Sequence, residues 1–300
     1  MPGHSGTDAI KKEATRIIAS RLGSLTLMSD YMFTAFMQNN NACMQVVLRA
    51  FTDDDSIIVT KVMTQYVVKN DAEGRGVRFD SLVETADGTL YNLEVENRPD
   101  GSLELRLRYY AVMLDKENLK KGDKFRDMPP VVNIVIMPKD IRGLNKPLYF
   151  VRRVFVESLK KIGEKPASFE DKTAFIYVNA TYRNTDTLVG KVIHDLTTPG
   201  NTAKLVKEIA VSMEKFISTE EGRKEMSATI AEYGLKAGNL EHLLSDTELT
   251  QAREYGRAQG WQDGQTEILQ QLADMGILSR ENLTMVYQGR ELPNIKFAGE

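Results

Sequence analysis

The sequence predicts an α/β or α+β sheet domain followed by a mostly helical C-terminal region. Apolar residues recur at helical spacing in two stretches before residue 120, and three segments rich in β-branched and aromatic residues lie between these stretches. An apolar run bounded by prolines follows, and strand signals disappear from about residue 188 onward. The order is therefore helix, three strands, helix, strand and helical tail, which is typical of one layered sheet domain.

The N-terminal part of the chain is expected to be helical. Residues 1–24 are polar and are expected to form a tail with a short helix over Asp8–Leu22. Ser29-Asp30 predicts a helix start, because a capping side chain precedes apolar residues at helical spacing. Asn39-Asn40-Asn41 interrupts that spacing, so two helical pieces are expected before the acidic stretch Thr52–Asp55.

The sheet elements follow in order along the chain. Residues with high strand propensity indicate the strands, and an amphipathic stretch that ends before Gly122 indicates the helix that follows the third strand. The expected strands are Ile57–Lys69, Val77–Thr85, Thr89–Asn97, Val131–Met137 and a further strand at Phe175–Val178, and the expected helix is Leu103–Leu119.

The C-terminal region, residues 186–300, is expected to consist of helices. They are predicted at Thr202–Phe216, Glu220–Tyr233 and Leu249–Met275. The last of these contains Gly256, Gly260 and Gly264. Glycines spaced four apart allow two helices to approach closely, so we expect a homo-oligomer contact through these helices.

Composition and charge exclude several classes of protein. The 300 residues are 42% hydrophobic and 27% charged, which is ordinary for a soluble globular protein. The net charge of -3 excludes a globally basic nucleic-acid coat protein but leaves room for a local basic groove. Cys43 is the single cysteine and the three histidines are scattered, so neither an internal disulfide nor a Cys/His zinc site is expected. With no long apolar run and no signal-peptide pattern, we expect a cytoplasmic protein without a membrane partner.

The hairpin formed by the second and third strands contains the candidate chemistry. Asp87-Gly88 is a strong turn signal. A three-residue loop, Ala86–Gly88, brings the apolar faces of the two strands together by pairing Phe79 with Val95 and Val83 with Tyr91. The same register places Asp80 directly opposite Glu94, on the other face.

Two carboxylates in this position repel each other unless a cation lies between them. Side chains directly opposite each other have β-carbons roughly 4.5–5.5 Å apart. Mg²⁺ prefers oxygen ligands and commonly takes one or two carboxylates, so Asp80 and Glu94 are candidate metal ligands. One alternative is a pair of solvent-facing carboxylates on a half-exposed sheet. A further alternative is a surface salt-bridge network, because Arg78 and Glu96 share the polar face.

Several short motifs in a particular order resemble a known family. They are Asp30-Tyr31-Met32-Phe33, Phe79-Asp80, Leu93-Glu94-Val95-Glu96, Arg106 with Tyr109-Tyr110, Pro130 to Ile136, and the glycines of the C-terminal helix. Together these motifs resemble the PD-(D/E)XK nuclease family transposases, which are close to the Rpn-type recombination-promoting nucleases. The resemblance covers residues 25–180 and extends to the C-terminal glycines.

The resemblance implies a restriction-endonuclease-like mixed sheet in a nuclease-like domain over residues 25–185. It also implies cleavage of DNA phosphodiesters that depends on Mg²⁺ or Mn²⁺, and a link to transposition or recombination of mobile elements. Carried over by position, Asp80 matches the metal-binding aspartate and Glu94 matches the second acidic ligand. The helical region that follows is then expected to serve oligomerisation or DNA contact.

One position departs from the family pattern. Two residues after Glu94 the wider superfamily has Lys, and this subfamily commonly has Gln, whereas this chain has Glu96. A Lys there stabilises developing negative charge, which a Glu cannot do. Glu96 is therefore a third metal ligand or a general base, or the site is degenerate.

Three further residues are candidates for supporting roles. Asp30 is either the helix-borne acidic residue of such sites or a helix cap. Arg106 and Tyr110 are four residues apart and share a helix face. Arg106 either approaches the carboxylates or a phosphate, or it forms a structural ion pair.

Two functions remain open at this point. The first is a Mg²⁺-dependent DNA endonuclease in which Asp80, Glu94 and Glu96 are catalytic. The second is a catalytically degenerate nuclease fold that acts as a DNA- or protein-binding module. Convergence of the three carboxylates in a cleft near a cation favours the first, and an arginine side chain in the metal position favours the second.

Overall fold

The structure is a computed structural model that describes residues 4–69, 74–97, 101–155, 168–237, 244–245 and 247–259. The chain forms two compact units. One unit, Arg21–Ile230, contains the whole sheet, and the other comprises Met1–Ser20 and Ala231–Glu300. Every residue predicted for the site belongs to the first unit, so the fold of that unit positions the site.

Two helices precede the sheet in this unit, α2 (Asp30–Met37) and α3 (Asn41–Thr52). Ser29 occupies the N-cap position of α2, which confirms the predicted helix start. Asn40 caps α3, because its side-chain oxygen accepts a hydrogen bond from the backbone N–H of Cys43 at 3.3 Å. The predicted break at the three asparagines is thus confirmed.

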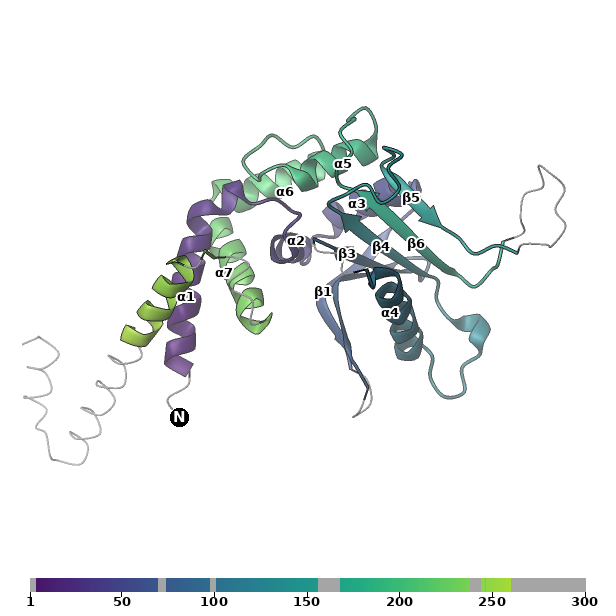
Figure 1. Ribbon diagram of the computed structural model, residues 1–300, viewed down its shortest axis with the longest axis horizontal. Helices are drawn as coiled ribbons and strands as arrows, with labels where there is room; N and C mark the ends of the chain where they lie inside the picture. The colour runs from purple at the N-terminus through teal and green to yellow at the C-terminus, as the bar shows by residue number, and fades with distance from the viewer. Residues whose placement is uncertain are drawn as a thin grey trace, which may run out of the picture. The chain divides into compact units, whose positions relative to one another are not determined.

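The sheet is mixed, with its strands in the order β1-β2-β3-β4-β6-β5 (Figure 1). Its strands are β1 (Val59–Val68), β2 (Val77–Thr85), β3 (Leu90–Val95), β4 (Val131–Met137), β5 (Leu148–Val151) and β6 (Thr173–Asn179). β3, β4 and β6 are parallel neighbours, whereas β1 and β2, β2 and β3, and β5 and β6 pair antiparallel. The five predicted strands are confirmed. β5 was not predicted, because its residues are partly or fully exposed and no buried apolar face marks it in the sequence.

Helices cover both faces of the sheet (Figure 1). On one face, Leu107 and Leu114 of α4 (Leu103–Asn118) join apolar clusters with strand residues that include Leu82 and Val135. On the opposite face, α2 contacts β1, β2 and β3, and α3 contacts β1 and β6. Because both faces are covered, every residue of β3 is buried.

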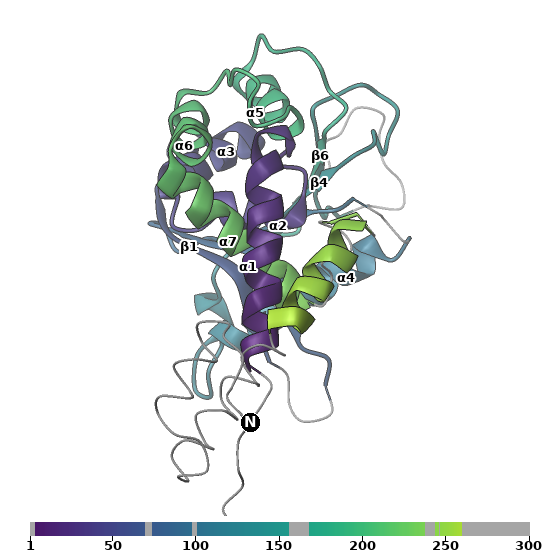
Figure 2. The same cartoon turned by 90° about the vertical axis from the view of Figure 1, so that its left-hand side faces the viewer.

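Further helices follow the sheet, and α5 and α6 pack against α3 (Figure 2). They are α5 (Leu188–Thr197), α6 (Lys207–Ser218) and α7 (Glu220–Ala237). α5 was not predicted, and the helix expected from Thr202 begins only at Lys207. The carboxylate of Asp195 accepts hydrogen bonds from the backbone N–H groups of Leu205 and Val206 at 2.8–3.0 Å, which holds these two residues outside the helix.

The second unit is helical where it is described. Helix α1 (His4–Arg21) begins earlier than the expected Asp8, and residues 247–259 form another helix. Lys11 Nζ lies 2.7 Å from Glu232 Oε2, so an ion pair joins α1 to α7. The C-terminal part of the expected helix Leu249–Met275, with Gly260 and Gly264, lies outside the described residues.

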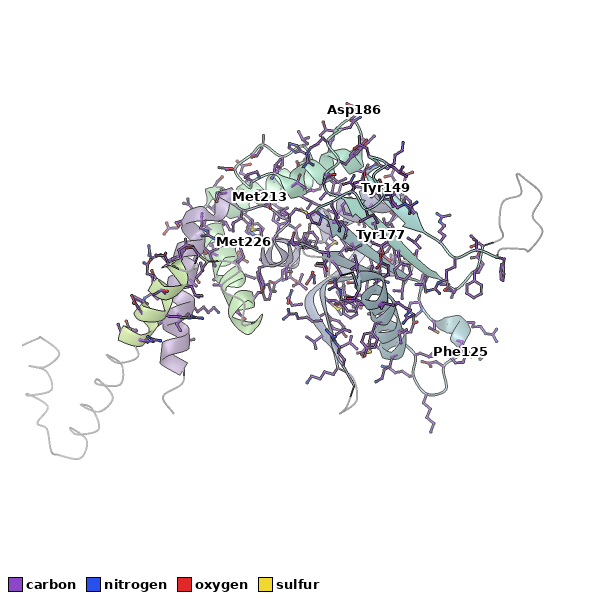
Figure 3. All side chains as sticks on the ribbon, in the orientation of Figure 1. Phe125, Tyr149, Tyr177, Asp186, Met213 and Met226 are labelled. Atoms are coloured by element: carbon purple, nitrogen blue, oxygen red, sulfur yellow. The ribbon has the colours of Figure 1, made fainter. Side chains whose placement is uncertain are left out.

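Two short 3-10 helices, Leu22–Ser24 and Phe125–Asp127, lie in the sheet-containing unit. Phe125, in the connection after α4, is 80% exposed (Figure 3). Among the described helices, none combines the length and the apolarity that crossing a membrane requires.

Candidate active site

The β2–β3 hairpin has the predicted register where its strands pair, between Ser81–Leu93 and Glu84–Leu90, and the predicted Phe79–Val95 pair is not among these pairs. Val83 pairs with Tyr91, and the loop ends at Gly88, whose φ of 82° is in the left-handed region that glycine favours. Continued by one residue beyond Ser81–Leu93, this register places Asp80 opposite Glu94. The backbone N–H of Asp80 donates to Glu94 Oε1 at 3.3 Å, and the backbone N–H of Val95 donates to Asp80 Oδ2 at 3.4 Å. The two acidic side chains are therefore held together at this point of the hairpin.

Strict alternation of the strand faces breaks at Asp80. Phe79 and Val83 were predicted to share one apolar face of β2. Instead, Phe79 packs with Leu82 in the apolar cluster under α4. On β1, Thr64 pairs with Ser81 and Tyr66 with Phe79, so the intervening Gln65 lies across from Asp80. Gln65 has a φ of 51°, a left-handed conformation that costs free energy for a residue with a side chain. Strain of this kind clusters at functional sites.

Glu94 is buried rather than solvent-facing. Its exposed fraction is 8%, because α4 covers this face of the sheet. Burial, and then the charge of Asp80, hold the pKa of Glu94 well above its usual range. The Asp80 backbone N–H and the Arg106 guanidinium act in the opposite direction. The alternative of two carboxylates on an exposed sheet face is therefore excluded for Glu94.

Glu96 lies beside a cation. The Arg106 guanidinium of α4 donates to Glu96 Oε2, and the exposed fractions of the two side chains are 32% for Arg106 and 11% for Glu96.

Burial raises the pKa of Tyr110 to about 12, and the nearby Glu94 carboxylate adds to this rise. Arg106 and Tyr110 thus face the acidic pair from one side of α4, the relation that their spacing predicts.

The three predicted carboxylates do not form one ligand cluster. Within the described ranges, no group of three or more His, Cys, Asp and Glu side chains is placed to hold a metal ion. Asp80 and Glu94 come together, and Glu96 lies against Arg106. Asp30 begins α2, but its side chain lies outside what the structure describes.

Two asparagines extend the polar layer beneath α4. Asn92 Nδ2 donates to Asn133 Oδ1 at 3.0 Å, and both residues are fully buried on neighbouring strands. In the described part of the chain, Asn92 Oδ1, Asn133 Nδ2 and Arg106 Nε are buried without a hydrogen-bond partner. Sequence reasoning missed this pair. The available signal was Asn133, a polar residue in the middle of the apolar run Val131–Met137.

A pocket of about 730 Å³ lies between α4 and the residues around the start of β2. Arg106 and Tyr110 line it, and both residues also lie close enough to Glu94 to interact with its charge. Arg75, which precedes β2, and Arg78 of β2 line the same pocket, which makes it strongly basic. Tyr109 Oη donates to the backbone oxygen of Arg75 at 2.6 Å and so joins the residues just before β2 to α4. Neither Arg75 nor Tyr109 was predicted to line this pocket.

Comparisons with known proteins agree with the geometry. A family model described as PD-(D/E)XK nuclease family transposase matches residues 27–184. Searches of curated proteins and of solved structures found no match to this chain. The six-stranded mixed sheet with helices on both faces is consistent with the restriction-endonuclease-like fold of that family, as predicted. Because the match covers more than half of its 300 residues, the chain belongs to the PD-(D/E)XK nuclease family transposases.

Proposed function

We propose that this protein is an endonuclease that hydrolyses DNA phosphodiesters with Mg²⁺ or Mn²⁺ held by Asp80 and Glu94, in transposition or recombination of mobile elements. Its family is one of nucleases, and PD-(D/E)XK nucleases generally use divalent metal ions. The facing pair of Asp80 and Glu94 beside an arginine-lined pocket is the observation that carries the proposal.

The donor set suits a divalent cation. Asp80 and Glu94 offer carboxylate oxygens, which Mg²⁺ and Mn²⁺ prefer. Their repulsion and the burial of Glu94 make the doubly ionised pair costly, and a cation between them removes that cost. When bound, such an ion polarises the scissile phosphate and lowers the pKa of a water ligand.

Glu96 stands at the position where the wider superfamily has a lysine, so the positive charge of that lysine is missing here. Arg106 is proposed to supply this charge instead. Its guanidinium is fixed by Glu96 and also acts on Glu94. A cation in this place stabilises negative charge that develops on a phosphate. Glu96 is then a positioning residue, because it orients Arg106.

Other residues around the pocket have simpler roles. Arg75 and Arg78 are suited to phosphate groups of the DNA backbone. With a pKa of about 12, Tyr110 keeps its proton at neutral pH, so its hydroxyl can donate a hydrogen bond but is not a general base.

A plasmid-nicking assay tests this function. The full chain should nick supercoiled DNA with Mg²⁺ or Mn²⁺ and not in EDTA. Asp80→Asn and Glu94→Gln should each lower the rate by about 100-fold or more, as loss of a charge-stabilising group typically does. The matched control is Glu84→Gln, which neutralises an exposed carboxylate of the same strand that lies 3.9 Å from Lys61. Wild-type nicking by Asp80→Asn would overturn the proposal.

The second candidate function is a degenerate nuclease fold that binds DNA or protein. The observation in its favour is the Glu96–Arg106 pair, which places an arginine beside the acidic residues instead of a lysine two residues after Glu94. This function predicts DNA or protein binding that is unchanged by EDTA, together with no nicking in any divalent metal. The same assay, paired with a binding measurement, separates the two.

A further inference from the structure

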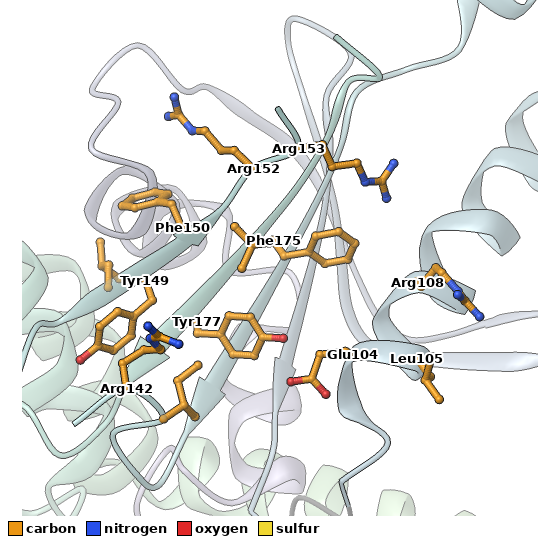
Figure 4. A pocket seen from close by; sticks show the side chains of 13 residues that line it. Glu104, Leu105, Arg108, Arg142, Tyr149, Phe150, Arg152, Arg153, Phe175 and Tyr177 are labelled. Carbon is orange, nitrogen blue, oxygen red and sulfur yellow. The ribbon is translucent and has the colours of Figure 1, made fainter. Parts of the chain in front are cut away.

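A second pocket, of about 920 Å³, lies at the far edge of the sheet from the β1–β2 hairpin (Figure 4). Its wall is formed by α4 on one side and by β5 and β6 on the other. Tyr149 and Tyr177, which pair across β5 and β6, line it (Figure 4). Nothing in the proposed nuclease reaction uses this pocket.

The pocket is strongly basic although the chain as a whole is acidic. Four arginines and a single carboxylate, Glu104, line it. Arg153 forms an ion pair with Asp171. The other three, Arg108, Arg142 and Arg152, are exposed and form no ion pair among the residues that the structure describes. This excess of cations selects an anionic ligand.

Aromatic side chains interleave with the arginines. Phe175 and Tyr177 project from β6 toward α4, and Arg108 and Arg152 flank them (Figure 4). Phe150 of β5 is 48% exposed at the same wall. Aromatic rings beside arginines bind unpaired nucleotides, because bases stack on the rings while phosphates meet the guanidinium groups. A duplex keeps its base faces stacked inside, so it cannot use these rings.

Sheet register connects this pocket to the acidic pair. Glu94 pairs with Val135, and Val135 pairs with Tyr177, so the three lie in one row across parallel strands. Two strand spacings separate Glu94 from Tyr177, which is roughly 10 Å. Leu105 of α4 is 59% exposed and lines both pockets. A single strand that crosses the first turn of α4 can therefore occupy both.

We propose that this pocket binds an unpaired segment of the nucleic-acid substrate, with its phosphates on Arg108, Arg142 and Arg152 and a base on Phe175. The proposal rests on the proposed nuclease function and specifies its substrate as DNA with a single-stranded region. The pocket then holds the strand that emerges from the cleavage site.

Fluorescence anisotropy with a labelled single-stranded oligonucleotide in EDTA tests binding apart from cleavage. Arg108→Glu with Arg152→Glu should weaken single-strand binding by at least about tenfold and lower the slope of log affinity against log salt by about 1.4, roughly 0.7 for each phosphate contact. Phe175→Leu keeps an apolar side chain but loses the ring, and should weaken binding by about fivefold or more. The control, Lys121→Glu with Lys224→Glu, makes the same charge change at exposed residues that line neither pocket.

Three outcomes would overturn the proposal. They are equal losses in the lysine control, unchanged single-strand affinity in the arginine variant, and competition by polyglutamate as effective as that by the oligonucleotide. The nicking assay distinguishes this failure from failure of the nuclease function. If the protein nicks DNA with metal but the arginine variant binds single strands as the wild type does, only the proposed role of this pocket is refuted. If the arginine variant loses binding but the wild type nicks in no metal, only the nuclease function is refuted.

Discussion

Glu96 and Arg106 form an ion pair that joins the end of strand β3 to the first turn of helix α4. Glu94, two residues earlier, lies instead against another carboxylate, Asp80. Two glutamates on one segment therefore have opposite electrostatic surroundings. Neutralising each one should have opposite effects on stability, and that contrast separates a metal-binding pair from a structural one.

Glu94→Gln should stabilise the metal-free protein. The substitution removes a buried charge that Asp80 repels, so we expect the free energy of unfolding in EDTA at pH 7.5 to rise by about 1 kcal/mol. Urea unfolding followed by circular dichroism measures it. A loss of stability of similar size would show that Glu94 is held by favourable contacts and would contradict the repulsion described for it.

Glu96→Gln should destabilise the protein under the same conditions. It leaves the Arg106 guanidinium partly buried without its carboxylate, and we expect a loss of about 1–2 kcal/mol, less than for a fully buried pair because Arg106 is 32% exposed. The double variant Glu96→Gln/Arg106→Gln should recover part of the loss. A change of less than a few tenths of a kcal/mol would indicate that the pair is not formed in solution.

Arg106 should matter for cleavage beyond its charge. Arg106→Gln is expected to lower the nicking rate by about 100-fold, because a cation that stabilises the phosphate is lost. Arg106→Lys should recover only part of the rate, since lysine lacks the planar fork that holds Glu96 and a phosphate together. Arg223→Gln, on the exposed side of α7, is the control. Full activity of Arg106→Gln would remove Arg106 from the site.

Gln65 offers a test of backbone strain next to Asp80. Gln65→Gly and Gln65→Ala both lose the 3.3 Å hydrogen bond to Thr34, so their difference isolates the left-handed φ of 51°. The Gly variant should be more stable than the Ala variant by roughly 0.5–1 kcal/mol. Glycine avoids a strain of about 1–2 kcal/mol, but it loses about 0.5–1 kcal/mol more conformational entropy on folding. Thermal unfolding of the two variants measures the difference, and an advantage for Ala would exclude the left-handed conformation.

Cys43 should be unreactive in the folded protein. Burial raises the pKa of its thiol to about 11, and its Sγ lies 3.1 Å from the backbone oxygen of Glu208. An exposed thiol has a pKa of about 8.5, so the thiolate fraction at pH 8 falls by roughly two orders of magnitude. Iodoacetamide labelling followed by mass spectrometry should be slow up to pH 10 and fast in urea. Rapid labelling at pH 8 without urea would contradict this burial.

The fold and the pairing of Asp80 with Glu94 could be predicted because they depend on local sequence signals. The turn at Asp87-Gly88 fixes the hairpin register, and that register brings Asp80 opposite Glu94, although Phe79 does not share the predicted apolar face with Val83. The family resemblance read from residues 25–180 is confirmed over residues 27–184. The start of α3 also follows from the capping side chain of Asn40 beside it in the chain, and Ser29 takes the N-cap position of α2 without a side-chain cap hydrogen bond.

Other features depend on contacts between distant segments. The Asn92–Asn133 pair exists because β3 and β4 are parallel in one particular register, which no turn chemistry specifies. α6 begins late because Asp195 binds the backbone before it.

The sequence by itself therefore determined the acidic pair and the order of the elements except β5 and α5, since neighbouring residues decide these features through turn geometry and side-chain periodicity. Only the tertiary structure decided that Glu94 is buried, that Glu96 meets Arg106, and that two basic pockets flank α4. The physical reason is that burial and charge pairing depend on which surfaces α4 covers, and residue spacing along the chain does not contain that information.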